Sequence, residues 1–258
     1  MVNSSADSHA GRLVLIAGPS CAGKTPLLHA LRRERPALVE RLEPVVLYND
    51  RNPRPGEVDG ADYHFRSRAH IESLDGNDRY VVMNVRGDLQ ALDVDTLEAR
   101  LREGDALFEG NPYVAAAMLE HPRLKSTPTL SVFISPVARG ELEAMASSER
   151  IDAEATVTEV MRRKLLRRAR RLKGELSRRD LDEVEARAGR AYDELRFAPR
   201  FEHVIANHDG EDSENWDTFP LVLGDARRVL LTVATLLAGG EAAGVEKWNR
   251  GLFEAVEG

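Results

Sequence analysis

The stretch Gly18-Pro19-Ser20-Cys21-Ala22-Gly23-Lys24-Thr25 decides the fold of this chain. It has the pattern G-x-x-x-x-G-K-[ST], follows the apolar run 13–17 and precedes the helix-forming segment 26–33. Strand, glycine loop and helix are the context in which this pattern predicts a phosphate-binding loop. The alternative, a plain glycine turn between a buried strand and its helix, is much less favoured by these flanks.

Each part of the stretch has a physical task in binding phosphate. Gly18 and Gly23 reach backbone angles that are closed to other residues, so successive N–H groups are able to point at one anion. The helix that follows adds the positive end of its dipole. Lys24 supplies a mobile positive charge for the terminal phosphates, and the Thr25 hydroxyl is a magnesium ligand. The stretch therefore predicts binding of a nucleoside triphosphate with Mg²⁺.

Composition excludes several other classes of protein. The 258 residues are 42% apolar, which is enough for the core of one α/β domain with additions. A formal net charge of -7 disfavours nucleic acid as a partner, since binding to the phosphate backbone needs a basic surface. No apolar run approaches the ~18 residues of a membrane span. The single cysteine excludes an intramolecular disulfide framework and fits a reducing compartment. We therefore expect a cytoplasmic protein with no nucleic-acid or membrane partner.

Apolar and helix-forming segments alternate along the chain. Residues 1–10 are polar and small, and we expect them to form a disordered leader. Buried-type strands are predicted at residues 13–17, 45–48, 80–83, 106–109, 130–134 and 201–206. Helical stretches separate these strands, for example at residues 96–101. This order predicts an α/β fold with three layers, in which a doubly wound, mostly parallel sheet binds ligands at the carboxyl ends of its strands.

The segment from 152 to 200 is predicted to be almost continuously helical. One face carries an apolar stripe that includes Met161, Leu165 and Leu172, and the other faces are rich in arginine. A solvated basic face balanced by the acidic residues from 180 to 185 is the commonest meaning of such a pattern. A nucleic-acid stripe is disfavoured because no aromatic residues interleave. The third interpretation is a kinase lid whose arginines neutralise a phosphoryl group in transfer.

A second motif identifies a family. The segment Arg51-Asn52-Pro53-Arg54-Pro55-Gly56-Glu57-Val58-Asp59-Gly60-Ala61-Asp62-Tyr63-His64-Phe65 resembles the monophosphate-binding segment of guanylate kinases, T-T-R-x-x-R-x-G-E-x-x-G-x-x-Y-x-F. The strand 131–136, Arg187, the pair 194–195 and the strand 204–207 also keep that family's spacing. The resemblance covers about residues 12–207 and is strongest before Phe65.

The resemblance implies a domain plan and an activity. Residues 11–207 would form a guanylate kinase-like P-loop domain, with a monophosphate-binding subdomain at about 45–100 and a helical lid at about 150–190. Residues 208–258 would be a C-terminal extension packed on the core. The activity would be ATP- and Mg²⁺-dependent transfer of the γ-phosphate to a phosphorylated small acceptor.

Site residues follow from the same resemblance. ATP is expected at Gly18, Ser20, Cys21, Ala22, Gly23, Lys24, Thr25 and Asn207, with Thr25 on the metal. The acceptor is expected at Arg51, Arg54, Glu57, Tyr63, Glu109 and Asn111. Lys24, Arg51, Arg171 and Arg187 are the expected catalytic residues. Two arginines three residues apart and a tyrosine hydroxyl suit an acceptor phosphate, because they surround it with charge-assisted hydrogen bonds. A polar loop held by surface ion pairs is the alternative.

The residues that read guanine in the family are not kept. An ungapped alignment places Leu47, Val82 and Asn111 at the family's serine, glutamate and aspartate, and no tyrosine stands near 90–92. Leaving a buried donor of the base unpaired costs roughly 1–3 kcal/mol. We therefore expect an acceptor other than GMP, or a relative of GMP that is read differently.

Two residues of the loop region also depart from the family. Pro26 stands where a serine or threonine reaches the α-phosphate, and proline has neither an N–H nor a hydroxyl, so we expect weakened ATP affinity. Cys21 stands where glycine is common. Its thiol is either acidified near a helix N-terminus or, as the spacing favours, a small side chain that fits the loop.

The C-terminal part holds an acidic run and an amphipathic segment. Residues 207–216 are expected to form a solvated acidic turn; the alternative places Asp209 or Asp212 on the substrate or a second cation, with His208 nearby. The helix expected at 222–237, with Trp248 and Phe253 after it, would cover the sheet or form a subunit contact, which leaves a homodimer open.

Three functions remain, in order of preference. The first is the kinase described above. The second is a catalytically weak or inactive guanylate kinase-like binding module, which the lost base readers favour and the complete Gly23-Lys24-Thr25 disfavours. The third is a nucleotide-dependent switch or hydrolase.

Overall fold

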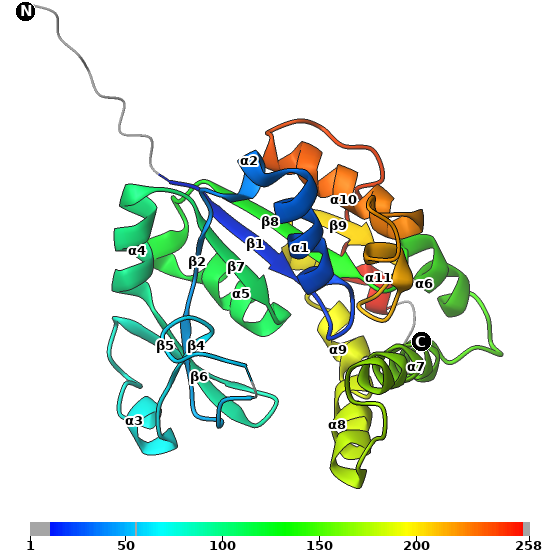
Figure 1. Ribbon diagram of the computed structural model, residues 1–258, viewed down its shortest axis with the longest axis horizontal. Coiled ribbons are helices and arrows are strands. Elements are labelled where there is room, and N and C mark those ends of the chain that lie inside the picture. The colour runs from blue at the N-terminus through cyan, green and yellow to red at the C-terminus, as the bar shows by residue number, and fades with distance from the viewer. Residues whose placement is uncertain (1–10, 55, 255–258) are drawn as a thin grey trace, which may run out of the picture. The chain divides into compact units, whose positions relative to one another are not determined.

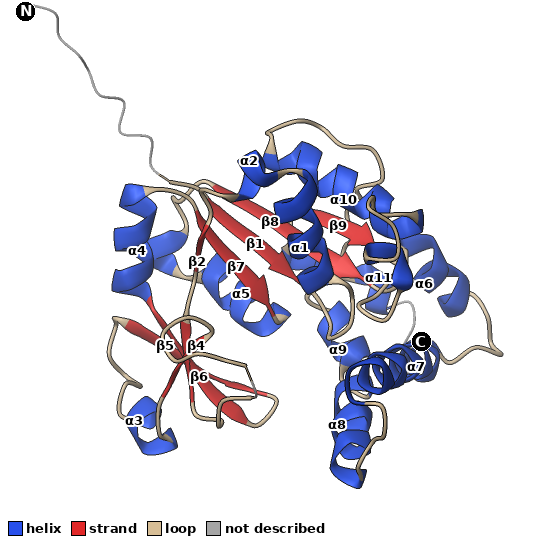
Figure 2. Ribbon diagram, in the orientation of Figure 1, coloured by secondary structure: helices blue, strands red, loops and turns tan. Residues whose placement is uncertain are grey.

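The computed structural model describes residues 11–54 and 56–254, and the predicted leader lies outside these ranges (Figures 1 and 2). The chain is a mixed α/β protein. Its strands are β1 (Leu13–Ala17), β2 (Glu43–Pro44), β3 (Leu47–Asn49), β4 (Tyr63–Phe65), β5 (Tyr80–Val85), β6 (Asp88–Asp93), β7 (Ala106–Gly110), β8 (Thr129–Ser135) and β9 (His203–Ala206). Its α-helices are α1 (Lys24–Glu34), α2 (Pro36–Val39), α3 (Arg68–Glu72), α4 (Val94–Glu103), α5 (Pro112–Glu120), α6 (Arg139–Ala146), α7 (Ala153–Lys173), α8 (Arg178–Ala188), α9 (Ala191–Leu195), α10 (Gly224–Leu237) and α11 (Gly251–Glu254). Short 3₁₀ turns lie at η1 (Pro122–Leu124), η2 (Ala198–Arg200) and η3 (Glu214–Trp216).

The main sheet has five strands in the order β2-β7-β1-β8-β9. All five residues of β1 are buried, as is expected of a strand covered on both faces. β2 pairs with β7 and β8 pairs with β9, in both cases in parallel. These pairings and the jumps in strand order confirm the predicted α/β fold with a parallel central sheet.

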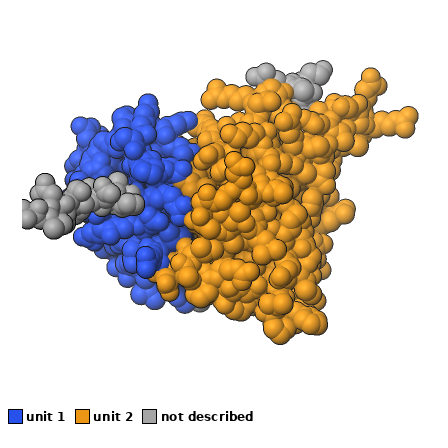
Figure 3. Space-filling model, turned by 90° about the horizontal axis from the view of Figure 1, so that it is seen from above, with its two compact units in different colours: residues 1–14, 41–108, 117–129 blue, residues 15–40, 109–116, 130–258 orange. Residues whose placement is uncertain are grey.

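The chain divides into two compact units, which Figure 3 colours separately. The first contains residues 1–14, 41–108 and 117–129, and the second contains residues 15–40, 109–116 and 130–258. Within the described ranges, no helix combines the length and apolar character that crossing a membrane requires.

The first unit contains a four-stranded sheet in the order β4-β3-β6-β5. β3 runs parallel to β4 and antiparallel to β6, and β5 and β6 form an antiparallel hairpin. Arg86 and Gly87 make the turn of this hairpin with φ of 60° and 100°, the left-handed angles that two-residue hairpin turns require.

One predicted strand of this unit was wrong in its bounds. We expected a single strand at 45–48, but the structure has β2 ending at Pro44 and β3 beginning at Leu47. β2 pairs with β7, and the Val45 N–H still donates to the Leu107 carbonyl. The chain then leaves this pairing to join the four-stranded sheet, and a change of partner sheet divides one apolar run into two short strands.

The second unit carries the phosphate-binding loop, the long helices and the C-terminal segment. α1 and α10 pack against each other, and the Val204 and Glu246 backbones form an antiparallel bridge beside β9. Val229, Leu230 and Val233 of α10 are buried. The amphipathic helix expected at 222–237 is therefore confirmed as α10.

The predicted helical region after residue 152 is confirmed as α7, α8 and α9. Asp152 caps α7 by accepting from the Ala155 N–H at 2.9 Å. Gly174, with φ of 73°, ends α7. Ser177 then caps α8, since its hydroxyl accepts from the Asp180 N–H. α7 and α8 pack side by side as a helical hairpin.

Candidate nucleotide and phosphate sites

The loop between β1 and α1 has the backbone that its glycines predict. Gly18 has φ of 150°, and a Cβ on it would lie 2.2 Å from the carbonyl oxygen of Ile134. Gly23 has φ of 97°, and a Cβ there would lie 2.4 Å from Nδ2 of Asn207. Neither position accepts a larger residue without movement of its neighbours. The close approach of β8 and of Asn207 therefore requires glycine at both ends of the loop.

Lys24 lies folded over the same loop. It is 6% exposed, and its Nζ donates to the carbonyl oxygens of Gly18 at 3.0 Å and Pro19 at 2.8 Å. An ammonium group has three donors, so two of them fix its position and the third is left for another acceptor. The positive charge is thus held above the backbone of the loop.

Thr25 and Glu109 form a hydroxyl–carboxylate pair beside the loop. The Thr25 Oγ1 donates to Glu109 Oε1 at 3.1 Å. Glu109 is the penultimate residue of β7 and therefore lies at the carboxyl end of the strand. Oxygen atoms of this kind are the ligands that Mg²⁺ prefers, and the ion usually keeps several waters and a phosphate as further ligands. The structure gives Glu109 a partner in the phosphate-binding loop, and its predicted role with the acceptor stays a prediction.

Cys21 is a buried part of the loop. Its side chain is fully buried, and burial together with the charges of Glu211 and Asp212 raises the pKa of the thiol to about 12. The structure therefore favours a small side chain that fits the loop over an acidified thiol, because desolvation and two nearby carboxylates raise the pKa. Cys21 also has φ of 67°, so it occupies a left-handed position that glycine would fill more easily.

Asn207 ties the end of β9 to the loop. Its side chain is completely buried, and Nδ2 donates to the carbonyl oxygens of Ala22 at 2.7 Å and Asp209 at 2.8 Å. The Glu211 N–H adds a bond to the Cys21 carbonyl at 3.3 Å. Residues 208–217, which we call the acidic segment, are thus anchored directly on the loop.

The polar side chains at the start of the acidic segment serve the turn itself. The Asp209 carboxylate accepts from the Ser213 hydroxyl, the Asn215 amide and the Ala226 N–H, at 2.8, 2.8 and 2.9 Å. His208 Nε2 lies 3.0 Å from Glu141. Among the residues that the structure describes, no group of three or more His, Cys, Asp or Glu is placed to hold a metal. These contacts favour the structural interpretation of the turn over a second cation site.

The arginines of α7 are engaged by the acidic segment. Arg167 pairs with Asp212 at 2.7 Å, Arg168 with Glu211 at 2.9 Å, and Arg171 with Asp217 at 2.6 Å. The buried Lys164 adds a hydrogen bond from its ammonium to the His208 carbonyl. This face of the basic helix is therefore neither a free solvated face nor a free phosphate-binding face. The other predicted lid arginine, Arg187, lies on α8 and pairs with Glu183 of the same helix at 3.5 Å.

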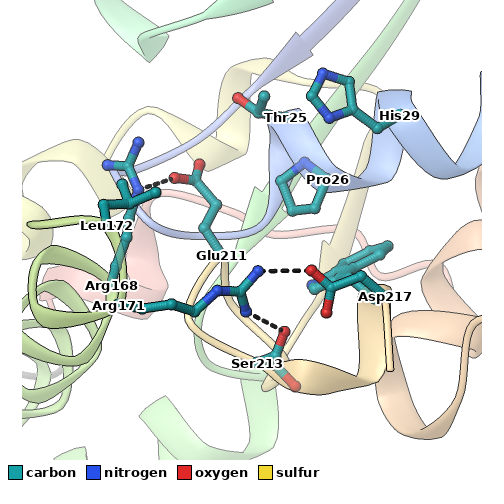
Figure 4. A pocket seen from close by; sticks show the side chains of 10 residues that line it. Thr25, Pro26, His29, Arg168, Arg171, Leu172, Glu211, Ser213 and Asp217 are labelled. Carbon is teal, nitrogen blue, oxygen red and sulfur yellow. Dashed lines mark hydrogen bonds and ion pairs between the residues drawn. The ribbon is translucent and has the colours of Figure 1, made fainter. Parts of the chain in front are cut away.

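A cavity of about 230 Å³ opens beside the loop (Figure 4). Its walls come from the first turns of α1, the last turns of α7 and the acidic segment. The residues that line it are Thr25, Pro26, His29, Arg168, Arg171, Leu172, Glu211, Ser213, Trp216 and Asp217. Trp216 is 3% exposed, and its indole N–H donates to the Asp209 and Gly210 carbonyls, both at 3.0 Å, which fixes the ring as one wall.

The first unit carries the predicted phosphate clamp. Arg51 and Glu57 form a bidentate pair with two N···O distances of 2.6 Å, and the Arg54 N–H donates to Glu57 at 2.7 Å. Hydrogen bonding from Arg51 holds the pKa of Glu57 below its usual value, and the same bond raises the pKa of Arg51. Both side chains are more than four-fifths buried, so the guanidinium is positioned by its partner before any ligand arrives.

Aromatic rings complete this clamp. The Arg51 guanidinium carbon lies 5.1 Å from the ring centre of Tyr63 and 5.4 Å from that of Phe65. Both rings come from β4, which pairs with β3 immediately before Arg51. The structure therefore brings Arg51, Arg54, Glu57 and Tyr63 together, as the sequence motif predicts.

The positions aligned with guanine-reading residues lie in apolar or structural surroundings. Val82 and Tyr48 pack on an apolar cluster of Ile71, Leu89 and Ala91. Leu47 is 3% exposed. In the second unit, Asn111 caps the start of α5, because its Oδ1 accepts from the Val114 N–H at 3.0 Å.

Sequence reasoning missed several residues of the cavity and its surroundings. Arg168, Glu211 and Trp216 line the cavity, and Lys164 reaches the acidic segment, yet none was singled out. The charge pattern could have indicated them, because an arginine-rich helix and an acidic run occur 40–45 residues apart in one chain.

Comparison with known proteins gives one family. Residues 10–172 match the family model described as guanylate kinase. The chain is 30% identical over 211 residues to a guanylate kinase of Corynebacterium jeikeium, a match that covers 80% of this chain and 93% of that one. It is 30% identical over 210 residues to a guanylate kinase of Corynebacterium diphtheriae, covering 80% and 92%.

Among solved structures, the chain is similar to the crystal structure of guanylate kinase from Anaplasma phagocytophilum. The TM-score is 0.50 with 17% sequence identity, and the match covers 90% of this chain and 86% of that chain. At this identity the likeness concerns the fold. The acidic segment lies beyond the residues that the family model matches.

Proposed function

The chain belongs to the guanylate kinase family of enzymes. We propose that it transfers the γ-phosphate of ATP, with Mg²⁺, to a phosphorylated small acceptor, either GMP or, as the replaced base-reading residues favour, a different monophosphate. The observation that carries this proposal is the combination of the phosphate-binding loop with the Arg51–Glu57 pair of the predicted phosphate clamp. Lys24 and Thr25, which contact the loop and Glu109, support a donor site, and the Arg51–Glu57 pair supports an acceptor site.

The donor side fits ATP in its chemistry. The loop amides and Lys24 suit the β- and γ-phosphates, since they offer backbone donors and one mobile charge. The neighbouring cavity of about 230 Å³ is smaller than a pocket for a whole drug-sized ligand, so it suits only part of the nucleotide. Thr25 and Glu109 fit a magnesium ion, which would neutralise charge on the phosphates during transfer.

The residues of this chain would act by positioning and by electrostatics. Lys24 would stabilise charge on the phosphoryl group in transfer, and Arg51 would hold the acceptor phosphate. Arg171 and Arg187 stay the lid arginines proposed from the resemblance. No covalent intermediate is needed, because both substrates bring phosphate oxygens as nucleophile and leaving group.

An acceptor other than GMP is favoured because apolar residues replace those that bind guanine in the family. Val82 lies against an apolar cluster and Leu47 is buried, so neither offers an acceptor for the N–H groups of guanine. Each unpaired donor would cost about 1–3 kcal/mol, and two would lower affinity by about 30-fold or more. A cytoplasmic location remains an expectation from the sequence, which leaves a homodimer open.

The test is ADP formation from Mg·ATP with a panel of acceptors. The panel contains GMP, other nucleoside monophosphates and sugar monophosphates, and Lys24→Ala serves as the inactive control. Turnover with a member other than GMP, lost in Arg51→Ala, supports the proposal. Efficient turnover of GMP would show that guanine is read by other residues. Nucleotide binding without turnover of any acceptor would favour a binding module, and phosphate release without acceptor would favour a hydrolase.

A further inference from the structure

Two carboxylates face the cavity from the acidic segment, and each holds an arginine that faces the same cavity (Figure 4). Glu211 accepts from Arg168 at 2.9 Å, and Asp217 accepts from Arg171 at 2.6 Å. Arg171 also donates to the Ser213 carbonyl at 3.4 Å. All four charged side chains are among the residues that line the cavity. The arginines nearest to the donor cavity are therefore already paired within the chain.

One residue of the cavity wall offers no hydrogen-bond donor. Pro26 lies in the first turn of α1 and lines the cavity, and proline offers neither an N–H nor a hydroxyl. A phosphate that reaches this turn from the loop would therefore find one hydrogen-bond donor fewer. Guanidinium groups offer five donors each and bind phosphate in a bidentate way. Arg168 and Arg171 are the guanidinium groups among the residues that line the cavity, and both suit a phosphate as a ligand.

We propose that Glu211 and Asp217 are competing anions of the donor site: they hold Arg168 and Arg171 in the empty cavity, and the phosphates of the donor take their place. This inference rests on the proposed function, because it requires a phosphorylated donor in the cavity. Glu211 and Asp217 then set how tightly the enzyme binds its donor, and Arg168 and Arg171 become donor-binding residues only after the exchange.

The competing carboxylates are held independently of the arginines. The Glu211 N–H donates to the Cys21 carbonyl, and Asp212 next to it pairs with Arg167. Trp216 precedes Asp217 and is fixed by two indole hydrogen bonds. The carboxylates therefore stay beside the cavity when an arginine turns away, and they are able to take it back when the donor leaves.

Exposure decides which pair matters more. The Glu211 side chain is 10% exposed and Arg168 is 34% exposed, whereas Asp217 and Arg171 are 54% and 44% exposed. Exposed pairs are screened by water and contribute little, and a carboxylate that is withdrawn from water competes more strongly. The Arg168–Glu211 pair should therefore lower donor affinity more than the Arg171–Asp217 pair.

The test is calorimetric binding of a non-hydrolysable ATP analogue with Mg²⁺ to the full chain. Glu211→Gln should lower the Kd about three- to tenfold, and Asp217→Asn should lower it about twofold. Asp212→Asn is the matched control, because it removes one negative charge from the same segment without opening a cavity-lining arginine, and it should change the Kd less than twofold. Arg168→Gln should raise the Kd at least threefold more in the Glu211→Gln background than in the wild type.

The outcomes separate this inference from the proposed function. Binding by the wild type and none by Lys24→Ala would show that the ATP site is present. In that case, a Kd of Glu211→Gln that is unchanged or higher, with no coupling to Arg168→Gln, overturns the inference. Binding by Glu211→Gln alone, with a wild type too weak to measure, supports it. If neither the wild type nor Glu211→Gln binds the analogue, the ATP site itself is wrong and the inference falls with it.

Discussion

Asn207 gives the sharpest prediction about how the phosphate-binding loop is held. Asn207→Ala removes two hydrogen bonds from Nδ2, to Ala22 and Asp209, and one to Oδ1 from the Asp209 N–H at 3.2 Å. The Asp209 carbonyl keeps Trp216 as a partner, but the Ala22 carbonyl, which faces a fully buried side chain, loses the bond that Asn207 gives it. The unsatisfied Ala22 carbonyl and the two lost bonds to Asp209 should together lower the free energy of unfolding by about 2–4 kcal/mol.

This loss should be visible in thermal unfolding followed by circular dichroism. For a chain of this length, about 3 kcal/mol corresponds to a fall in Tm of roughly 6–12 °C. Asn207→Asp, which keeps an acceptor but loses both donors, should be at least as destabilising. Asn111→Ala is the matched control, because it removes a single cap bond to Val114 and should cost about 1 kcal/mol. A Tm for Asn207→Ala that equals that of Asn111→Ala would refute the reasoning.

Four further predictions follow from named contacts. Gly18→Ala should destabilise the fold by about 2–4 kcal/mol, measured by urea unfolding, because its Cβ would lie 2.2 Å from a carbonyl oxygen. Cys21 should resist a thiol reagent at pH 8 in the native protein and react fully in urea, since burial raises its pKa to about 12; fast native labelling would contradict this. Glu109→Gln should raise the Mg²⁺ concentration for half-maximal activity about tenfold, with an unchanged requirement arguing against the Thr25 pair. The hydrogen bond from Arg51 lowers the pKa of Glu57 in the folded chain, so the ionised pair stabilises the protein above the pKa that Glu57 has when unfolded. The difference in unfolding free energy between the wild type and Glu57→Gln should therefore shrink as pH falls through the lowered pKa. Urea midpoints measured over a range of pH would show this change.

The sequence predicted the parts of the molecule that depend on local patterns. The glycines of the loop, the helix after them and the buried runs of β1 and β8 all have short-range signals, and the structure agrees with them. The clamp of Arg51 and Glu57 was predictable for the same reason, since both lie within one motif of fifteen residues. The error at residues 45–48 arose because the pattern of a strand does not say which sheet it joins.

The contacts that the sequence did not predict join residues far apart in the chain. Thr25 meets Glu109 across 84 residues, and Arg168 meets Glu211 with α8, α9 and β9 between them in the chain. An arginine-rich helix predicts a need for counter-charges but does not name them. The fate of the lid arginines therefore became visible only when the helix and the acidic segment were placed in one structure.

The bond between Asn207 and Ala22 has a consequence for the protein during its synthesis. The two residues are 185 positions apart, so the loop leaves the ribosome long before its anchor does. At about 5–20 residues per second, roughly 10–40 s separate the two events. In the nascent chain the glycine-rich loop is made before the Asn207 side chain, the Trp216 indole and the acidic segment that pack against it in the folded protein. Nucleotide capture by the growing polypeptide should consequently be the last property to mature, and a ribosome stalled before residue 207 would carry a chain that folds its first strands but holds no ATP.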